Sequence, residues 1–457
     1  MRTIGIDLAV TAAHKAVVMA EDGQFVTPVF SFQTGWDELE EVVKRARTGV
    51  EPEYPLRAVM EPTGMAWFPV AVGLGRLGVT PYMVNGRRVH DLRRFYKRHS
   101  SSDRISARVL ARMPVVDPES LYPLEIPTAM RFACQRGCKE LDRLQTLITA
   151  CQNRLRDTDR FAWPGLESVF KDIFSPAARC FRQSWYDPVQ VVTAGPEALR
   201  QAFAAIISSE GNLEWVDQLV RLALEVLKLY GPEALDYALL QQEVCRQQRW
   251  LAALEAEVSQ LWRQTVRPLY RQLHPSRHLE SLYGVGEEGA AVHVSFIGRA
   301  DRFPDNRHFR GWHGLVPDSR QSGEAESKGL HISQAGPDLL KKFAYLNADV
   351  ARRYDPQIAA IYYDQMVHKG KHHNQAVCAC ATHLLDRIRA VLREERPYEL
   401  RDTKGQPVTP AQARTIIAER FTVPDEVRKR NNYRARRKRA EQQAERKRKT
   451  GSRSKKR

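Results

Sequence analysis

The segment Thr3-Ile4-Gly5-Ile6-Asp7-Leu8-Ala9-Val10 opens the chain with an apolar run of strand type that carries one acidic residue. A second such run, Leu56-Arg57-Ala58-Val59-Met60, leads directly to Glu61. Short apolar runs of this kind predict buried strands. A buried carboxylate is costly unless it is paired or binds a metal ion. A third acidic residue, Asp103, follows the basic stretch 87–102.

Carboxylate oxygens are the ligands that Mg²⁺ prefers, and the ion usually keeps waters and substrate phosphates as its other ligands. Asp7, Glu61 and Asp103 are therefore candidate ligands for Mg²⁺ or Mn²⁺. A pair of such ions can stabilise the attacking and leaving oxygens of a phosphodiester. The alternative is that Asp7 and Glu61 merely end strands at a solvated edge of a sheet.

The surrounding pattern predicts an α/β domain over residues 1–125. Strands come first and then alternate with helices, which indicates a mixed sheet flanked by helices. The expected strands are 4–6, 15–19, 25–32, 58–60 and 80–84, and the expected helices are 37–47, 67–77 and 102–113.

The rest of the chain is expected to be mainly helical. Leucines at helical spacing in 128–158 and 233–273 predict long paired helices, acting as a spacer or as an oligomer-forming antiparallel coil. Turn residues within 160–232 indicate a small helical insertion between them. The Gly284-Val-Gly286 element resembles the hairpin of helix-hairpin-helix motifs, whose amides can meet phosphate, although glycine pairs also mark plain turns. The expected domains are 1–125, 126–275 with the insertion 160–232, 276–395, and a linker with a disordered basic tail at 396–457.

Composition excludes several classes of protein. The 457 residues are 43% hydrophobic and 27% charged, which is typical of a globular chain of two to four domains. No apolar run approaches the ~18 residues of a membrane span, and no signal peptide is evident. The seven cysteines form no quartet at zinc-binding spacing, so we expect free thiols in a reducing cytoplasm.

Positive charge is concentrated at the C-terminus. Residues 428–457 contain 16 Lys and Arg and two acidic residues, so they carry +14 of the total charge of +17. Such a segment has no apolar face to bury and is expected to be disordered alone, and to bind nucleic-acid phosphates without reading sequence. A solubility tail is the alternative. The candidate contacts are Arg436, Arg437, Lys438 and Arg439.

A glycine-flanked serine follows the segment Gly314-Leu-Val-Pro317, in Gln321-Ser-Gly323. A serine hydroxyl is a weak nucleophile unless a base or a metal ion activates it. No Ser-His-Asp set and no Gly-x-Ser-x-Gly elbow surrounds Ser322. From these residues alone, Ser322 is predicted to be a serine in a turn and not a nucleophile.

Two groups of motifs occur in a fixed order along the chain. The first group is Ile4-Gly-Ile-Asp7, Glu61-Pro-Thr-Gly64, Gly78-Val-Thr-Pro-Tyr-Met-Val-Asn85 and Ser102-Asp-Arg-Ile-Ser-Ala107. The second is Gly284-Val-Gly286, Phe303, Gly314-Leu-Val-Pro317, Gln321-Ser-Gly323, Ile332 and Gly336. Together they resemble the DEDD transposases of the insertion sequence 110 family, over residues 1–158 and 234–395.

The resemblance implies a RuvC-like, RNase H-type domain joined through a coiled coil to a mainly helical transposase domain. It implies a DNA recombinase that is guided by a noncoding RNA from its own element and that acts as a dimer or tetramer. It places such a protein in a bacterial or archaeal cytoplasm, at the nucleoid. The family's acidic set falls on Asp7, Glu61 and Asp103, and its nucleophile falls on Ser322.

One position departs from the family pattern. Ser106 stands three residues after Asp103, where the family usually has a fourth acidic residue. Three carboxylates can still suffice for Mg²⁺. The alternatives are a hydrolytic junction endonuclease of the RuvC type and a nucleic-acid-binding homologue with impaired catalysis. From their location alone, the candidates for binding phosphate near the serine are Arg310, Arg320 and Lys328.

Overall fold

The computed structural model divides into two compact units, Met1–Thr128 and Ala129–Arg457. Each unit is described by itself. The described residues are 1–84, 86, 89–90, 92, 103–118, 121, 123–204, 206, 214–231, 233–316, 321–322, 325–326, 332–333 and 336–454.

The N-terminal unit contains a five-stranded mixed sheet, as predicted. Its strand order is β3-β2-β1-β4-β5. β4 pairs in parallel with both β1 and β5, and β2 pairs antiparallel with both β1 and β3. The strands are β1 (Arg2–Asp7), β2 (His14–Met19), β3 (Phe30–Phe32), β4 (Leu56–Met60) and β5 (Val79–Met83).

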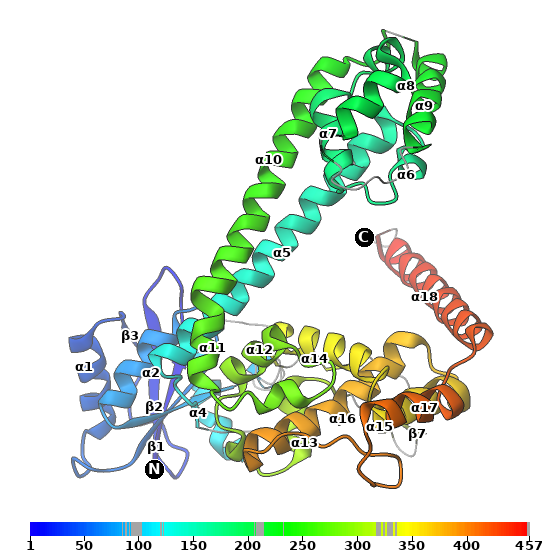
Figure 1. Cartoon of the computed structure of the whole chain (residues 1–457). Helices are drawn as coiled ribbons and strands as arrows, with labels where there is room; N and C mark the ends of the chain where they lie inside the picture. The colour runs from blue at the N-terminus through cyan, green and yellow to red at the C-terminus, as the bar shows by residue number, and fades with distance from the viewer. Residues whose placement is uncertain are drawn as a thin grey trace. The chain divides into compact units, whose positions relative to one another are not determined.

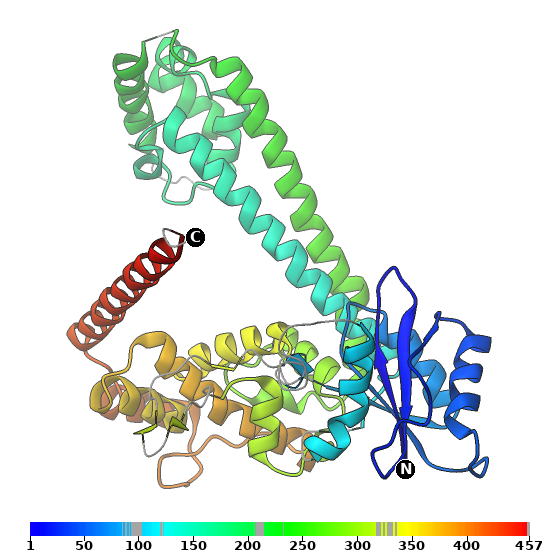
Figure 2. The same ribbon diagram turned by 180° about the vertical axis from the view of Figure 1, so that it is seen from behind.

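Helices cover both faces of this sheet (Figures 1 and 2). Ile4 and Ile6 of β1 pack in one core with residues of α1 (Trp36–Arg47) and α2 (Trp67–Arg76). On the other face, Ala107 and Ala111 of α4 (Asp103–Val116) pack against β2. Because β1 is covered on both faces, its central residues Ile4, Gly5 and Ile6 are all apolar.

The predicted strand 25–32 is wrong in its first half, because only Phe30–Phe32 is a strand. Phe25 forms an isolated bridge with Met19. Between them, Pro28 has no N–H to donate to the sheet, and the Thr27 hydroxyl accepts a hydrogen bond from the Val18 amide at 3.0 Å. The proline and this side-chain bond interrupt the pairing.

The C-terminal unit begins with the predicted pair of long helices. They are α5 (Ala129–Ala162) and α10 (Tyr237–Leu261), which lie side by side and antiparallel (Figure 1). The segment between them forms α6 (Leu166–Val169), α7 (Pro176–Ser184), α8 (Pro188–Ala204) and α9 (Glu214–Tyr230), which share one core with the adjoining parts of α5 and α10. A π-helical turn, Trp262–Val266, separates α10 from α11 (Arg267–Leu273), next to Pro268.

The remaining helices form one core with α16 (His373–Glu394), which is buried along one side. The others are α12 (Glu287–Ile297), α13 (Asn306–His313), α14 (Asp338–Ala351), α15 (Pro356–Tyr363) and α17 (Pro410–Arg420). Two short strands, β6 (Gln321–Ser322) and β7 (Ala325–Glu326), form a hairpin between α13 and α14. In the described part of the chain, no helix is both long and apolar enough to cross a membrane.

The expected linker and disordered tail differ from the structure. Residues 396–427 contain α17, which begins with a capping box at Thr409, and Leu400 and Val423 of this segment are buried. The tail continues as helix α18 (Asp425–Ser454). Asn431 anchors its first turns by donating from Nδ2 to the Met366 carbonyl at 2.8 Å. The rest is rich in Arg, Lys, Glu, Gln and Ala, which favour helix.

Candidate active site

Two of the predicted acidic residues end adjacent parallel strands. In the register of β1 and β4, Ile6 lies opposite Met60. Asp7 directly follows Ile6, and Glu61 directly follows Met60. The two acidic residues therefore lie at the same edge of the sheet. Neighbouring strands are about 4.8 Å apart, and side chains alternate between faces. Both carboxylates therefore belong to the face covered by α4, and both are half-buried.

The backbone after β5 passes directly over one of these carboxylates. A Cβ atom built on Gly86 would lie 2.3 Å from Oε1 of Glu61. A side chain at position 86 is therefore incompatible with the observed position of Glu61. A larger residue at this position would therefore displace the Glu61 carboxylate.

Helix α4 lies against the same face of β1, and Gly5 makes this contact possible. A Cβ atom at Gly5 would lie 2.2 Å from the Ala107 carbonyl oxygen and 2.4 Å from the Ala111 nitrogen. Ser106, which precedes Ala107, is only 5% exposed. Asp103 is the first residue of α4, and its side chain lies outside the described part of the structure. The fold thus brings the first turns of α4 onto the strand that carries Asp7.

The donor set at this edge fits a hard divalent cation. Asp7 and Glu61 supply carboxylate oxygens, and Mg²⁺ is typically bound by one or two carboxylates together with waters and phosphates. Among the side chains that the structure describes, no group of three His, Cys, Asp or Glu residues is arranged to hold a metal ion. That search does not include the Asp103 side chain.

Ser322 lies in the C-terminal unit, on strand β6. Gln321 pairs with Glu326, and Ser322 pairs with Ala325 in a tight hairpin. The backbone of the serine is therefore at the end of a short strand. The side chain of Ser322, and the whole of Arg320 and Lys328, lie outside the described residues.

Arg310, the remaining candidate near the serine, forms an ion pair within the C-terminal unit. Its Nε donates to Oδ1 of Asp386 at 2.8 Å, and its Nη2 contacts the other carboxylate oxygen. The Asp386 carboxylate raises the pKa of the Arg310 guanidinium. This bidentate pair fixes α13 against α16, so it favours a structural role for Arg310 over contact with phosphate.

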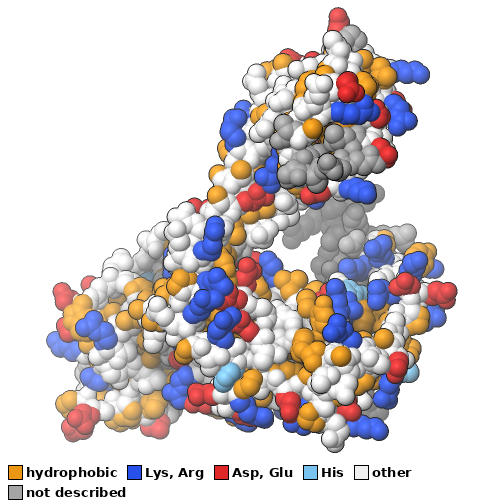
Figure 3. Space-filling model, in the orientation of Figure 1, with side chains coloured by type: hydrophobic (Ala, Val, Ile, Leu, Met, Phe, Trp, Pro, Cys, Tyr) orange, Lys and Arg blue, Asp and Glu red, His pale blue; other side chains and the backbone are white. Residues whose placement is uncertain are grey.

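The basic residues of the tail are displayed on α18. Arg436, Arg437, Lys438 and Arg439 are exposed, and Arg437 donates to Glu441 at 2.9 Å. On the face of the molecule in Figure 3, Lys and Arg side chains elsewhere are interspersed with Asp and Glu. The excess positive charge therefore belongs to the tail, as the sequence predicts.

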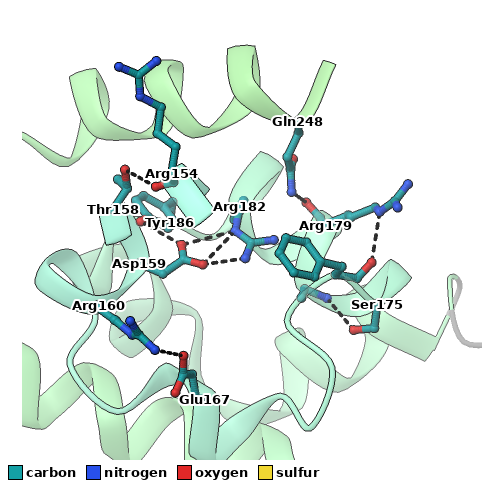
Figure 4. Close-up of polar contacts among 12 residues, drawn as sticks. Arg154, Thr158, Asp159, Arg160, Glu167, Ser175, Arg179, Arg182, Tyr186 and Gln248 are labelled. Carbon is teal, nitrogen blue, oxygen red and sulfur yellow. Dashed lines mark hydrogen bonds and ion pairs between the residues drawn. The ribbon is translucent and has the colours of Figure 1, made fainter. Parts of the chain in front are cut away.

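Sequence reasoning missed a buried ionic network at the end of the long helix pair (Figure 4). The Arg182 Nη2 donates to Oδ2 of Asp159 at 2.5 Å, and the Tyr186 hydroxyl donates to Oδ1 at 3.1 Å. Burial is the main cause that raises the pKa of Tyr186. The sequence did contain a signal for this network. Asp159 lies at helical spacing between the apolar residues Leu155 and Ala162, on the side of the helix that is expected to be buried. The network connects α5 to α7 and stabilises the fold.

Two family models match the chain. One, a DEDD model for insertion element IS110 described as Transposase, matches residues 4–162, and the other, described as Transposase IS116/IS110/IS902 family, matches residues 276–363. The uncharacterized 44.8 kDa protein of insertion element IS116 from Streptomyces clavuligerus is 26% identical over 415 residues, which are 89% of this chain and 97% of that protein.

Two further relatives carry similar descriptions. The uncharacterized 43.6 kDa protein of insertion element IS110 from Streptomyces coelicolor is 32% identical over 154 residues, 34% of this chain. That alignment spans only 35% of the relative's own length. The uncharacterized 42 kDa protein of insertion element IS900 from Mycobacterium paratuberculosis is 24% identical over 325 residues, 69% of this chain and 77% of that protein.

Proposed function

Because the chain belongs to the IS110 family of DEDD transposases, we propose that it excises and inserts its own mobile element by DNA strand exchange. The observation that supports this most directly is the register of β1 and β4, in which Asp7 and Glu61 end adjacent parallel strands. In this proposal the N-terminal unit is an RNase H-like domain of the RuvC type. Residues 276–395 form the transposase domain that carries Ser322.

In the proposed mechanism, Asp7, Glu61 and Asp103 hold Mg²⁺ or Mn²⁺. The bound ion would supply neutralisation of charge on the phosphate in the transition state. Ser322 supplies the nucleophile. Its Oγ loses its proton and forms a bond to phosphorus, while the bond from phosphorus to one DNA oxygen breaks and that oxygen takes up a proton. The product is a covalent phosphoserine. The oxygen of a second DNA end then attacks this phosphorus, and the serine Oγ leaves and takes up a proton.

The proposed partners are the DNA of the element and its target, and a noncoding guide RNA. The exposed Arg436, Arg437, Lys438 and Arg439 of α18 can neutralise phosphates of either nucleic acid without reading sequence. The long helices α5 and α10 are the proposed surface for a homodimer or homotetramer. Arg320 and Lys328 remain candidates for contact with phosphate oxygens near the serine.

The experiment that tests this function uses DNA whose cleaved end cannot be rejoined. We expect the wild-type protein to form a covalent adduct that survives denaturing gels and maps to Ser322. We expect Ser322→Ala to abolish adduct formation and strand exchange while nucleic-acid binding persists, because only a hydroxyl is removed. The matched control is Ser319→Ala, three residues away, which should leave exchange largely intact.

Asp7→Asn tests the acidic residues in the same assay. The substitution keeps the shape of the side chain and removes its charge, so cleavage should fall by orders of magnitude with little loss of fold. Full activity of this variant, or an adduct at Ser319, would overturn the assignment. Cleavage without any adduct would favour the hydrolytic endonuclease instead.

The buried Ser106 favours one further alternative, a homologue with impaired catalysis. Ser106 is 5% exposed and lies beside the Ala107 contact with β1, where the family pattern has a carboxylate. If the site binds metal, Ser106→Asp should preserve or tighten Mg²⁺ binding, by about tenfold if the added charge contributes ~1.4 kcal/mol. A calorimetric titration that detects no Mg²⁺ binding to either protein would support the impaired homologue.

A further inference from the structure

Two neighbouring asparagines anchor the start of the basic helix α18. Asn431 is 3% exposed, and its Nδ2 donates to the Met366 carbonyl at 2.8 Å and to the Lys371 carbonyl at 3.2 Å. The Oδ1 of Asn432 accepts a hydrogen bond from the His373 amide at 3.1 Å. The asparagine pair, Asn431 and Asn432, therefore joins α18 to one short stretch of chain, residues 366–373.

This stretch contains backbone groups that need such partners. Met366 lies in a π-helical turn, Asp364–His368, and His373 is the first residue of α16. In the described part of the chain, the N-cap residue His372 forms no side-chain hydrogen bond that caps α16. The first amides of a helix have no partner within the helix, so the Asn432 side chain supplies the cap. The asparagine pair is therefore built into the fold of the C-terminal unit.

Beyond the asparagine pair, α18 carries positive charge on all sides. Its exposed basic residues here are Arg434, Arg436, Arg437, Lys438 and Arg439. Successive residues of an α-helix are turned by about 100°, so these five lie around the whole circumference, with no gap wider than about 100°. The helix continues to Ser454, and residues 433–454 span about 33 Å at about 1.5 Å per residue.

This distribution of charge fits a groove better than a flat surface. A helix that lies on a flat polyanion uses the basic residues of one side only. In the major groove of B-form DNA, which admits an α-helix, phosphates of the two strands flank the helix on both sides. The length of about 33 Å is also close to one turn of this duplex. The major groove of an RNA duplex is deep and narrow, so it does not offer the same fit.

We propose that α18 is a fixed arm that lies in the major groove of a DNA duplex, and that Asn431 and Asn432 set the direction in which this arm leaves the C-terminal unit. The proposal rests on the proposed function only in that DNA is the partner. It adds a defined groove and a fixed point of departure to the neutralisation of phosphates. The asparagines are positioning residues and do not contact DNA.

Two substitutions that add the same charge test the asparagine pair. In Asn431→Asp the new carboxylate has no N–H to donate to the two carbonyls. In Asn432→Asp it still accepts from the His373 amide, and a negative charge is favourable at the start of α16. We expect Asn431→Asp to speed hydrogen exchange of the amides that follow it in α18 by about tenfold or more, and Asn432→Asp to leave this exchange unchanged.

Binding of a DNA duplex of about two helical turns provides the second comparison. Asn431→Asp should bind this duplex about fivefold more weakly than Asn432→Asp, because an arm that is not held must be ordered on binding. The two variants carry the same charge, so a difference between them reports the lost hydrogen bonds. Asn432→Ala repeats the test at a less buried position. It removes the acceptor and should also speed exchange, and Asn432→Asp restores the acceptor.

Modified DNA tests the groove without any change to the protein. A bulky group on C5 of thymine projects into the major groove. The wild type should bind a duplex with such groups about tenfold more weakly than the unmodified duplex, and a protein that lacks residues 428–457 should bind both equally. Deletion of these residues should also weaken binding of DNA more than binding of an RNA duplex of the same sequence.

Each part of the proposal can fail separately. Wild-type exchange and duplex binding in both Asn431→Asp and Asn432→Ala would overturn the fixed arm. Equal binding of modified and unmodified DNA by the wild type, or equal losses of DNA and RNA binding on deletion of the tail, would overturn the placement in the major groove. None of these measurements uses strand exchange. If Ser322→Ala still exchanges strands, the proposed function fails, and these measurements still decide the arm.

Discussion

Replacing Gly5 with alanine tests whether the contact between α4 and β1 sets the geometry of the acidic residues. The new Cβ would lie 2.2 Å from the Ala107 carbonyl oxygen and 2.4 Å from the Ala111 nitrogen, whereas real Cβ contacts essentially never fall below 3.0 Å. Both neighbours are backbone atoms, so no side chain can rotate away. Helix α4 must therefore move from β1 by roughly 0.8 Å or more. Overpacking of this kind typically costs about 1–3 kcal/mol of stability.

The same movement should reduce activity more than stability. A displacement of about 1 Å at a catalytic group can lower the rate about 100-fold. We therefore expect Gly5→Ala to lower the unfolding midpoint of the N-terminal unit and to reduce DNA cleavage by about two orders of magnitude, at a temperature where the protein is still folded. Circular dichroism on denaturation and a single-turnover cleavage assay provide the two measurements.

The control for this prediction is Gly35→Ala in the same unit. A Cβ atom at Gly35 has nothing within 4 Å, and the backbone there is extended. Gly35 is the N-cap of α1, where alanine is less favourable than glycine, so the substitution should cost about 1 kcal/mol of stability and leave cleavage unchanged. If Gly5→Ala behaves like Gly35→Ala, the packing of α4 does not determine the site, and our reasoning is refuted.

Three further predictions concern the C-terminal unit. Deleting residues 428–457 should weaken nucleic-acid binding and flatten its salt dependence, by about 0.9 in the logarithmic slope for each phosphate that the protein no longer neutralises, and an unchanged slope in a filter-binding titration would contradict this. Arg182→Ala should cost about 3–5 kcal/mol in chemical denaturation because it leaves a buried carboxylate unpaired, whereas the exposed Arg160→Ala should cost under about 1 kcal/mol. Lowering the pH from 6.5 towards 4 should lower the unfolding midpoint. His293 has a pKa of about 3 in the folded protein and stays neutral, whereas it binds a proton in the unfolded chain. His293→Gln should make the midpoint depend less on pH.

The sequence predicted the sheet well because its strands have a strong local signal. The apolar runs before Asp7 and Glu61 are too short for helices and are covered on both faces in the structure, as β1 and β4 are. The failure at residues 25–32 came from Pro28, whose effect depends on whether a neighbouring strand requires its N–H. That requirement is a property of the tertiary structure and is not visible in the pattern of apolar residues.

The contacts that shape the candidate site were less predictable. The sequence marks Gly5 and Gly86 only as glycines in or near strands, and nothing local indicates that Ala107 and Glu61 approach them. The neutral His293 was also missed, because a histidine in an apolar helix has the same pattern whether its ring is charged or not. A helix in 425–454 was expected only on a polyanion, because the charge pattern indicated disorder alone although the residues favour helix.

Ser106 replaces the fourth carboxylate of the family pattern, and its effect depends on what holds the candidate site in place. The contact of Gly5 with the backbone of Ala107 and Ala111 holds α4 against β1, so the position of α4 does not require an acidic side chain at residue 106. A buried hydroxyl there changes the charge of the site and leaves its framework intact. Any catalytic defect caused by Ser106 should therefore be electrostatic. It should be reversed by Ser106→Asp at constant fold or by a higher Mg²⁺ concentration, whereas the defect of Gly5→Ala, which is a displacement, should respond to neither.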